Sequence, residues 1–187
     1  FTPNFMNFSQ SLFKYDGKAI SKIKDITSGG GLFTKSKISN SQYLFFGGID
    51  NENGHELWRT DGTEAGTVLI KDIYPGTKSG LNFSLDHSII FNDVLYFVAD
   101  EGTNGKELWR SDGTESGTYM VKDIAPFSGS FEDSDPEEFV IFKNELYFFA
   151  KSKGQTSGAH KNYDVWKTDG TEQGTIKISN NESSSSV

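Results

Sequence analysis

One phrase occurs three times in this chain, and it constrains the fold more than any other feature. It reads ELWRTDGTEAGTVLIKDI at 56–73, ELWRSDGTESGTYMVKDI at 107–124 and, less faithfully, DVWKTDGTEQGTIKISNN at 164–181. The tryptophans of the three copies, Trp58, Trp109 and Trp166, are 51 and 57 residues apart. A repeat of that length predicts an array of similar units that bury their apolar faces against one another.

A weaker copy, SLFKYDGKAISKIKDIT, occupies residues 11–27. Phe13 stands there in the place of the tryptophan, and Asp16-Gly17 in the place of the Asp-Gly turn. We therefore divide the chain into half a unit followed by three whole units and a polar tail. The predicted boundaries are 1–27, 28–73, 74–124, 125–179 and 180–187.

Each whole unit predicts four short strands. In the second whole unit the strands are expected at 83–91, 94–100, 106–112 and 117–124. The pairs Asn-Asp, Asn-Gly and Asp-Gly between them are typical of tight hairpin turns. No segment has an apolar period of 3.6 residues, so no helix is expected.

The expected strands are apolar on both faces, as in VLYFVAD at 94–100 and ELYFFA at 145–150. Such strands are buried on both sides, whereas a two-layer sandwich leaves one face polar. The predicted fold is all-β, a β-propeller or partial propeller of about three full blades and a half blade, the half holding strands 3 and 4. We expect the missing strands to lie beyond residue 187, in a longer chain or larger assembly; a complete four-bladed propeller is the alternative.

The two complete copies resemble the ELWxxDGT repeat of large bacterial exported and surface proteins. The resemblance covers about residues 11–178, and the copy at 164–181 departs from it, with Asp164-Val165 replacing Glu-Leu and Lys177-Ile178-Ser179 replacing Lys-Asp-Ile. It implies a propeller-like, non-catalytic repeat domain that is extracellular or associated with the bacterial cell surface or outer membrane. It supplies no catalytic residues.

Composition excludes several classes of function. The net charge of −8 argues against nucleic acid as the partner, because phosphate binding needs a basic patch. The absence of cysteine excludes disulfides, thiolate catalysis and cysteine-ligated zinc. No apolar run approaches the roughly 20 residues that a transmembrane helix needs.

Every residue type in the repeated phrase has a role in folding. The Asp side chain accepts N–H groups across the turn, the following Gly provides a positive φ, and the Trp brings a large apolar area between units together with an indole N–H that needs a partner. The residues assigned to the scaffold are Trp58, Asp61, Gly62, Trp109, Asp112, Gly113, Trp166, Asp169 and Gly170.

Cation binding by the three aspartates is the alternative, but one carboxylate per loop is too few for a calcium loop. Arg59 and Arg110 are expected to pair with an acid such as Asp72 or Asp123, or to stack on an aromatic ring.

The variable loops are better candidates for a binding site. The last unit has a long loop between its second and third strands, 151–163, and a long incoming crossover, 125–138, and both are expected at the same end of the sheet. Insertions that share a face often mark the binding face of a repeat protein. The candidate residues are Asp50, Glu52, Asp100, Glu101, Glu132, Asp133, Asp135 and His160. The alternative is that acidic loops only maintain solubility.

No cofactor is expected. Bound calcium remains a hypothesis for DNENGHE at 50–56, whose oxygen ligands stand at alternating positions but lack the full spacing of a calcium loop.

The predicted function is a non-catalytic interaction module that binds a protein or a glycan, in adhesion, surface assembly or scaffolding. One alternative is a glycan hydrolase or lyase, for which the first strands offer Lys35, Lys37, Asp86, His87 and Glu138. The other alternative is a passive spacer.

Overall fold

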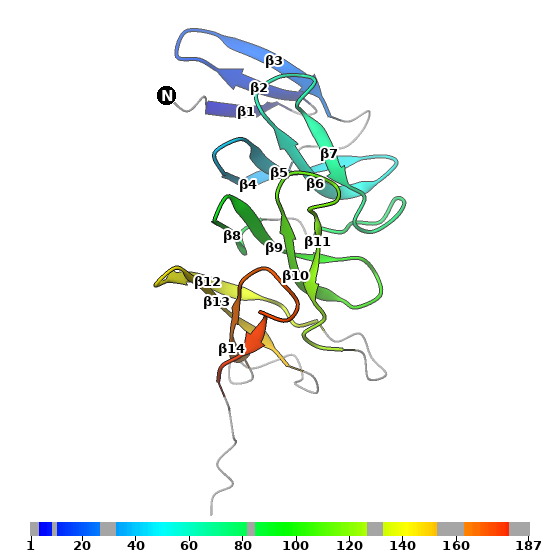
Figure 1. Cartoon of the computed structure of the whole chain (residues 1–187). Coiled ribbons are helices and arrows are strands. Elements are labelled where there is room, and N and C mark those ends of the chain that lie inside the picture. Colours follow the sequence, from blue (N-terminus) through cyan, green and yellow to red (C-terminus); the bar gives the residue numbers. More distant parts are fainter. Residues whose placement is uncertain are drawn as a thin grey trace, which may run out of the picture.

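The computed structural model describes residues 4–8, 11–26, 33–81, 85–126, 133–152 and 163–179. The described part of the chain is all-β and contains no helix. Its strands form four antiparallel sheets, and within each sheet neighbouring strands are consecutive in sequence (Figure 1). The prediction of an all-β fold made of repeated antiparallel units is confirmed.

The first sheet contains β1 (Asn4–Phe8), β2 (Ser11–Tyr15) and β3 (Ile20–Asp25). The second contains β4 (Phe33–Ser39), β5 (Leu44–Asp50), β6 (Gly54–Thr60) and β7 (Val68–Lys71). The third contains β8 (Ser88–Phe91), β9 (Val94–Asp100), β10 (Lys106–Ser111) and β11 (Tyr119–Lys122). The fourth contains β12 (Glu137–Phe142), β13 (Glu145–Lys151), β14 (Tyr163–Thr168) and β15 (Ile176–Lys177).

Two details differ from the sequence-based expectation. The first sheet has three strands rather than two, because β1 pairs with β2 from Asn4 opposite Tyr15 to Phe8 opposite Ser11. The strand expected at 83–91 begins only at Ser88, since Asp86 and His87 form a bend before it. The turn after β8 is as predicted: Asn92 and Asp93 both have positive φ, 51° and 62°, the conformation of a two-residue hairpin whose twist matches its strands.

The four sheets stack in chain order, and an apolar cluster fills each junction (Figure 1). Each sheet meets the sheet before it with the face that carries the tryptophan, which we call its trailing face. In the second, third and fourth sheets the trailing face is marked by Phe46 and Trp58, by Phe97 and Trp109, and by Phe148 and Trp166.

The opposite face, which we call the leading face, packs against the next sheet. In the first three sheets it carries Leu12, Ile23 and Ile26; Phe45, Leu57, Ile70 and Ile73; and Tyr96, Leu108, Val121 and Ile124. Phe45 and Phe46 are adjacent and both completely buried, one in each neighbouring junction. The unbroken apolar runs of the sequence therefore arise because inner sheets are covered on both faces.

The Asp-Gly turn has the same hydrogen bonds in all three copies that carry a tryptophan. In the third sheet Asp112 Oδ1 accepts the Thr114 N–H at 2.8 Å and the Thr114 hydroxyl at 2.7 Å. Gly113 has a φ of 91°, and the Ser111 and Thr118 hydroxyl oxygens lie 2.7 Å apart beneath the turn. Asp61 and Asp169 repeat the pattern with their own threonines. The predicted roles of Asp and Gly in this turn are confirmed.

The lysine of each Lys-Asp-Ile segment crosses to the next sheet. Lys24 Nζ donates to Thr67 O at 2.8 Å, Lys71 Nζ to Thr118 O at 2.9 Å, and Lys122 Nζ to Glu172 O at 3.3 Å. Each acceptor belongs to the Asp-Gly turn segment of the following unit. The repeated phrase therefore specifies both a sheet and its attachment to the next one.

The arginines stack on tyrosines of their own sheets. The Arg59 guanidinium lies 4.1 Å from the Tyr43 ring centroid, and that of Arg110 lies 5.3 Å from the Tyr119 centroid. The ion pairs found among the described residues use lysine, so the stacking prediction holds and the acid pairing does not. The expected hydrogen bond of the indole N–H is absent at all three tryptophans in the described structure.

Gly117 provides a test of the turn, because a Cβ atom there would lie 2.1 Å from Asp112 Oδ1. We expect Gly117→Ala to displace Asp112 and lower the free energy of unfolding by about 1–3 kcal/mol, as overpacking does elsewhere. Urea denaturation of the two proteins measures the difference. Ser116→Ala is the matched control, since Ser116 is exposed beside the same turn, and a Gly117→Ala protein as stable as that control would contradict this account.

Candidate functional site

The crossovers between sheets attach to strand ends on the side opposite the Asp-Gly turns. Between the second and third sheets, Leu81 N donates to His55 O at 3.0 Å and Asp100 N donates to Gly80 O at 2.9 Å. Between the third and fourth sheets, Ser134 N donates to Lys106 O at 3.0 Å and Lys151 N donates to Ser134 O at 2.8 Å. The crossovers and the loops between second and third strands thus share one end of the stack, which we call the loop end.

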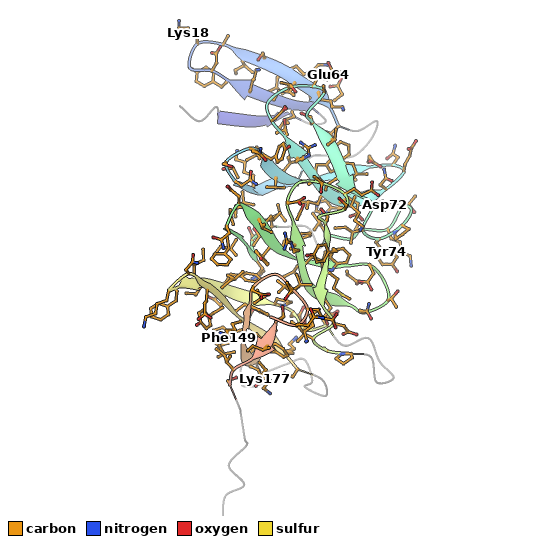
Figure 2. All side chains as sticks on the ribbon, in the orientation of Figure 1. Lys18, Glu64, Asp72, Tyr74, Phe149 and Lys177 are labelled. Atoms are coloured by element: carbon orange, nitrogen blue, oxygen red, sulfur yellow. The ribbon has the colours of Figure 1, made fainter. Side chains whose placement is uncertain are left out.

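A buried glutamate anchors each of these two crossovers. Glu56 and Glu107, the first residues of the repeated phrase, are fully buried. Glu56 accepts the N–H groups of Ile73, Tyr74 and Gly80, at 3.1, 3.2 and 2.7 Å. Burial raises the pKa of Glu56 to about 7, although these N–H donors oppose the shift. Figure 2 shows Asp72 and Tyr74 on the crossover that this carboxyl holds.

Glu107 holds the next crossover in the same way. Its carboxyl accepts the N–H groups of Ile124 and Ala125, at 3.0 and 3.3 Å, and lies 2.6 Å from the Ser134 hydroxyl. Burial raises the pKa of Glu107 to about 8, with the nearby Asp123 adding to the shift. In the third copy Asp164 takes this place and binds Lys177 and Ser152 instead, at 2.7 and 2.6 Å. The first residue of the repeated phrase therefore fixes the backbone on which the loops are carried.

A pocket of about 240 Å³ opens at the loop end between the third and fourth sheets. Its walls come from the bend before β8, from β9 and β10, from the crossover into β12, and from β14. The lining residues are His87, Val98, Ala99, Lys106, Asp135, Pro136, Glu137 and Tyr163. The pocket therefore combines an apolar floor with charged groups and one aromatic ring, a composition typical of small ligand sites.

Two lysines and two aspartates form an ion-pair network at the pocket. Lys106 Nζ lies 3.3 Å from Asp133 Oδ2 and 3.7 Å from Asp135 Oδ1. Lys151 Nζ pairs with Asp135 Oδ2 and lies 5.4 Å from the centre of the Tyr163 ring. The Lys106 backbone N–H also donates to Asp133 Oδ1 at 2.9 Å. These contacts hold β10, the crossover, β13 and β14 in one arrangement around the opening.

The network keeps both lysines protonated. Burial alone would lower the pKa of Lys106, but the carboxylates of Asp133 and Asp135 hold it above its ordinary value. At Lys151 burial acts in the same direction, and Asp135 outweighs it, so that the pKa of Lys151 is also raised. The charges of this cluster therefore compensate one another. The pocket presents fixed hydrogen-bond donors and acceptors rather than a strong field of one sign.

The backbone beside the pocket has unusual conformations. Asp135 and Glu138 have φ values of 42° and 54°, in the left-handed region that residues other than glycine rarely adopt. Such positions cost about 1–3 kcal/mol and concentrate at ligand sites, where the surrounding contacts enforce them. Here the pairing of Asp135 with Lys106 and Lys151 supplies contacts of that kind. The observation supports the choice of this pocket as the candidate site.

The structure brings together only part of the acidic set expected from the sequence. Asp133 and Asp135 meet in the network. Asp50 instead folds its own loop, accepting the N–H groups of Glu52 and Asn53 at 2.9 and 2.6 Å. Asp100 and Glu101 do the same in the third sheet, accepting the N–H groups of Gly102 and Asn104 at 2.6 and 3.1 Å. Glu132 and His160 lie outside the described residues.

Calcium and catalytic metal sites find no support in the described ranges. No group of three or more histidine, aspartate or glutamate side chains there is placed to hold a metal ion. The turn aspartates already use Oδ1 for two bonds to threonine, and His55, within the DNENGHE segment, is buried in β6.

Sequence reasoning missed the cationic and aromatic half of the site. Lys151 and Tyr163 bound the long loop 151–163 and Lys106 begins β10, so charge complementarity with Asp133 and Asp135 was the available signal. His87, considered only for catalysis, lines the pocket.

No family model matches the chain, and no curated protein matches it either. Within the described residues no helix is long and apolar enough to cross a membrane. The function must therefore be argued from the geometry of the loop end.

The two buried glutamates predict a pH-dependent stability. Because folding raises the pKa of Glu107 from about 4.5 to about 8, the folded state binds the extra proton, and stability is lost as the pH rises between these values. We expect the free energy of unfolding to fall by roughly a few kcal/mol from about pH 5 to pH 8. Urea denaturation across this range measures it. Glu107→Gln, which does not titrate, should reduce the fall, whereas Glu115→Gln at an exposed turn should not; equal slopes in all three proteins would contradict the assignment.

Proposed function

We propose that this chain is a non-catalytic interaction module of a bacterial exported or surface protein, and that it binds a glycan through the loop-end pocket. The observation that carries the proposal is that the repeated residues form the scaffold, while the segments that vary between units form the pocket. The repeated phrase is used in turns, junctions and crossover anchors, whereas the pocket is built where the units differ most. A scaffold that is constant at one end and variable at the other is typical of binding repeat proteins.

The chemistry of the pocket favours a sugar over a cation or a basic protein surface. Asp133 and Asp135 are compensated by Lys106 and Lys151, so that Glu137 is the one lining carboxylate outside the ion-pair network of the described residues. A single carboxylate is a weak attraction for a cationic partner. Fixed donors and acceptors beside the half-buried ring of Tyr163 suit hydroxyl groups and the apolar face of a sugar ring. The volume of about 240 Å³ matches one sugar residue of a longer chain rather than an extended peptide.

The scaffold proposed for this module is part of a β-propeller. Meander sheets stacked with leading face on trailing face are the arrangement of propeller blades. The first strands also approach one another, since β8 contacts both β4 and β12, as the innermost strands of adjacent blades do. An extracellular location is proposed from the resemblance of ELWRTDGT and ELWRSDGT to the repeats of exported proteins.

Binding can be tested with defined oligosaccharides. Isothermal titration of the chain with a panel of soluble neutral and uronic-acid-containing oligosaccharides should find at least one that binds, and Tyr163→Ala should weaken it by about tenfold or more, the loss of roughly 1.4 kcal/mol. Tyr15→Ala, at a half-buried tyrosine of the first sheet, is the matched control. Absence of binding across the panel, or equal affinity in the Tyr163 variant, would overturn the proposal. Release of shortened products from a bound oligosaccharide would favour the hydrolase or lyase alternative.

A further inference from the structure

The leading face of the fourth sheet is exposed, although the same face is buried in the sheets before it. Of the eight exposed large hydrophobic side chains among the described residues, six lie in or beside this sheet. They are Val140, Ile141, Phe142, Phe149, Ile176 and Ile178. Figure 2 shows Phe149 on this sheet, at the end of the stack far from the first sheet.

Equivalent positions can be identified from the strand pairing. Phe46, Phe97 and Phe148 stand opposite Trp58, Trp109 and Trp166, which aligns the three sheets residue by residue. In this alignment Phe142 corresponds to Phe91 and Ile178 to Val121. Phe91 and Val121 are 7% and 3% exposed, whereas Phe142 and Ile178 are 57% and 47% exposed. The exposed fractions therefore differ because the third sheet is covered by a following sheet and the fourth is not, since the side chains at these positions are similar.

The exposed face is also hollowed in a way that suits an aromatic side chain. A groove of about 270 Å³ with almost entirely apolar walls crosses it, lined by Glu138, Val140, Phe142, Tyr147, Phe148, Phe149 and Val165. Tyr147 and Val165 correspond to Tyr96 and Leu108, which pack against Trp166 and Phe148 in the junction between the third and fourth sheets. The groove thus lies where the next tryptophan-bearing face would be seated.

We infer that this face, formed by Val140, Phe142, Tyr147, Phe149, Val165, Ile176 and Ile178, docks a further sheet of the same repeat, presented by its tryptophan-bearing trailing face. The argument is continuity with three interfaces already present, each of which places a trailing face on a leading face. The inference concerns an interaction surface and does not depend on glycan binding at the loop end.

The polar attachments of this junction differ from those of the others. Strand pairing corrects the sequence alignment here: Trp166 pairs with Lys177 as Trp109 pairs with Met120, so Lys177 does not stand at the lysine position. Ser179 replaces the lysine that reaches the next turn in the first three sheets, and Lys177 is already paired with Asp164 at 2.7 Å. Lys167, at the place of Arg59 and Arg110, pairs with Glu145 at 2.6 Å. Docking at this face therefore rests on apolar contact more than the inner junctions do.

A duplication supplies the proposed occupant. A second copy of residues 71–126, which contain the crossover and the third sheet, is fused directly after Ile178, so that Ile178 takes the place of Ile70 before the crossover. Hydrogen exchange of the β13 and β15 amides should slow by about tenfold or more relative to the parent chain, because a covered sheet opens less readily. The control fusion carries Phe97→Ser and Trp109→Ser in the duplicate alone and should lose this protection.

Unchanged exchange of β13 and β15 in the fusion would overturn the inference. A duplicate that stays unfolded would overturn it equally, because the same unit folds against the second sheet in the parent chain. Sedimentation of the parent chain over a concentration series tests the other occupant. Self-association that Phe142→Glu abolishes would assign the face to a second copy of this chain and overturn the repeat-sheet occupant.

Phe149→Ser combined with Ile178→Ser examines the surface in the parent chain itself. The two residues are 40% and 47% exposed, so thermal unfolding should be little changed, while the fluorescence of an apolar dye bound to the protein should fall by about half or more. A marked loss of thermal stability, or undiminished dye binding, would show that these side chains do not form the exposed face.

Discussion

The packing of each tryptophan-bearing face on the sheet before it is the interaction on which the rest of this structure depends. A four-stranded meander of about 35–40 residues has two apolar faces and no core of its own, so its stability comes from packing against a neighbouring sheet. Burial of one large apolar side chain contributes about 1.5–3 kcal/mol, and each junction contains several. The Asp-Gly turn, the crossing lysine and the buried glutamate all serve to present these faces in register.

The polar part of the repeat follows from that requirement. Stacked sheets need connections that return from the last strand of one unit to the first strand of the next. Such a connection buries backbone N–H groups, and each of them needs a hydrogen-bond acceptor. Glu56 and Glu107 accept these N–H groups, at the cost of placing a carboxyl group in an apolar junction. The residues that begin the repeated phrase and those that end it therefore act together across the loop end, even though they are far apart in sequence.

The repeated pattern of the sequence was sufficient to predict the fold, whereas the candidate site lies in segments that do not repeat and could not be predicted in the same way. The strands, the hairpin turns and the burial of Phe45 and Phe46 on opposite faces follow from local pattern and unit length. Pairing of Lys106 and Lys151 with Asp133 and Asp135 depends on how a non-repeated crossover folds back over two sheets, and no local pattern encodes that geometry. For the same reason Asp50 and Asp100 were assigned to a surface cluster, whereas their short-range bonds to Asn53 and Gly102 close separate loops.

The stacking order has a mechanical consequence. Among the described residues, each apolar cluster joins a sheet to its neighbour in sequence, so that the sheets form a one-dimensional series of coupled elements. Tension applied along such a series is relieved one element at a time. The chain would then extend in steps and dissipate force gradually, as an extensible tether does.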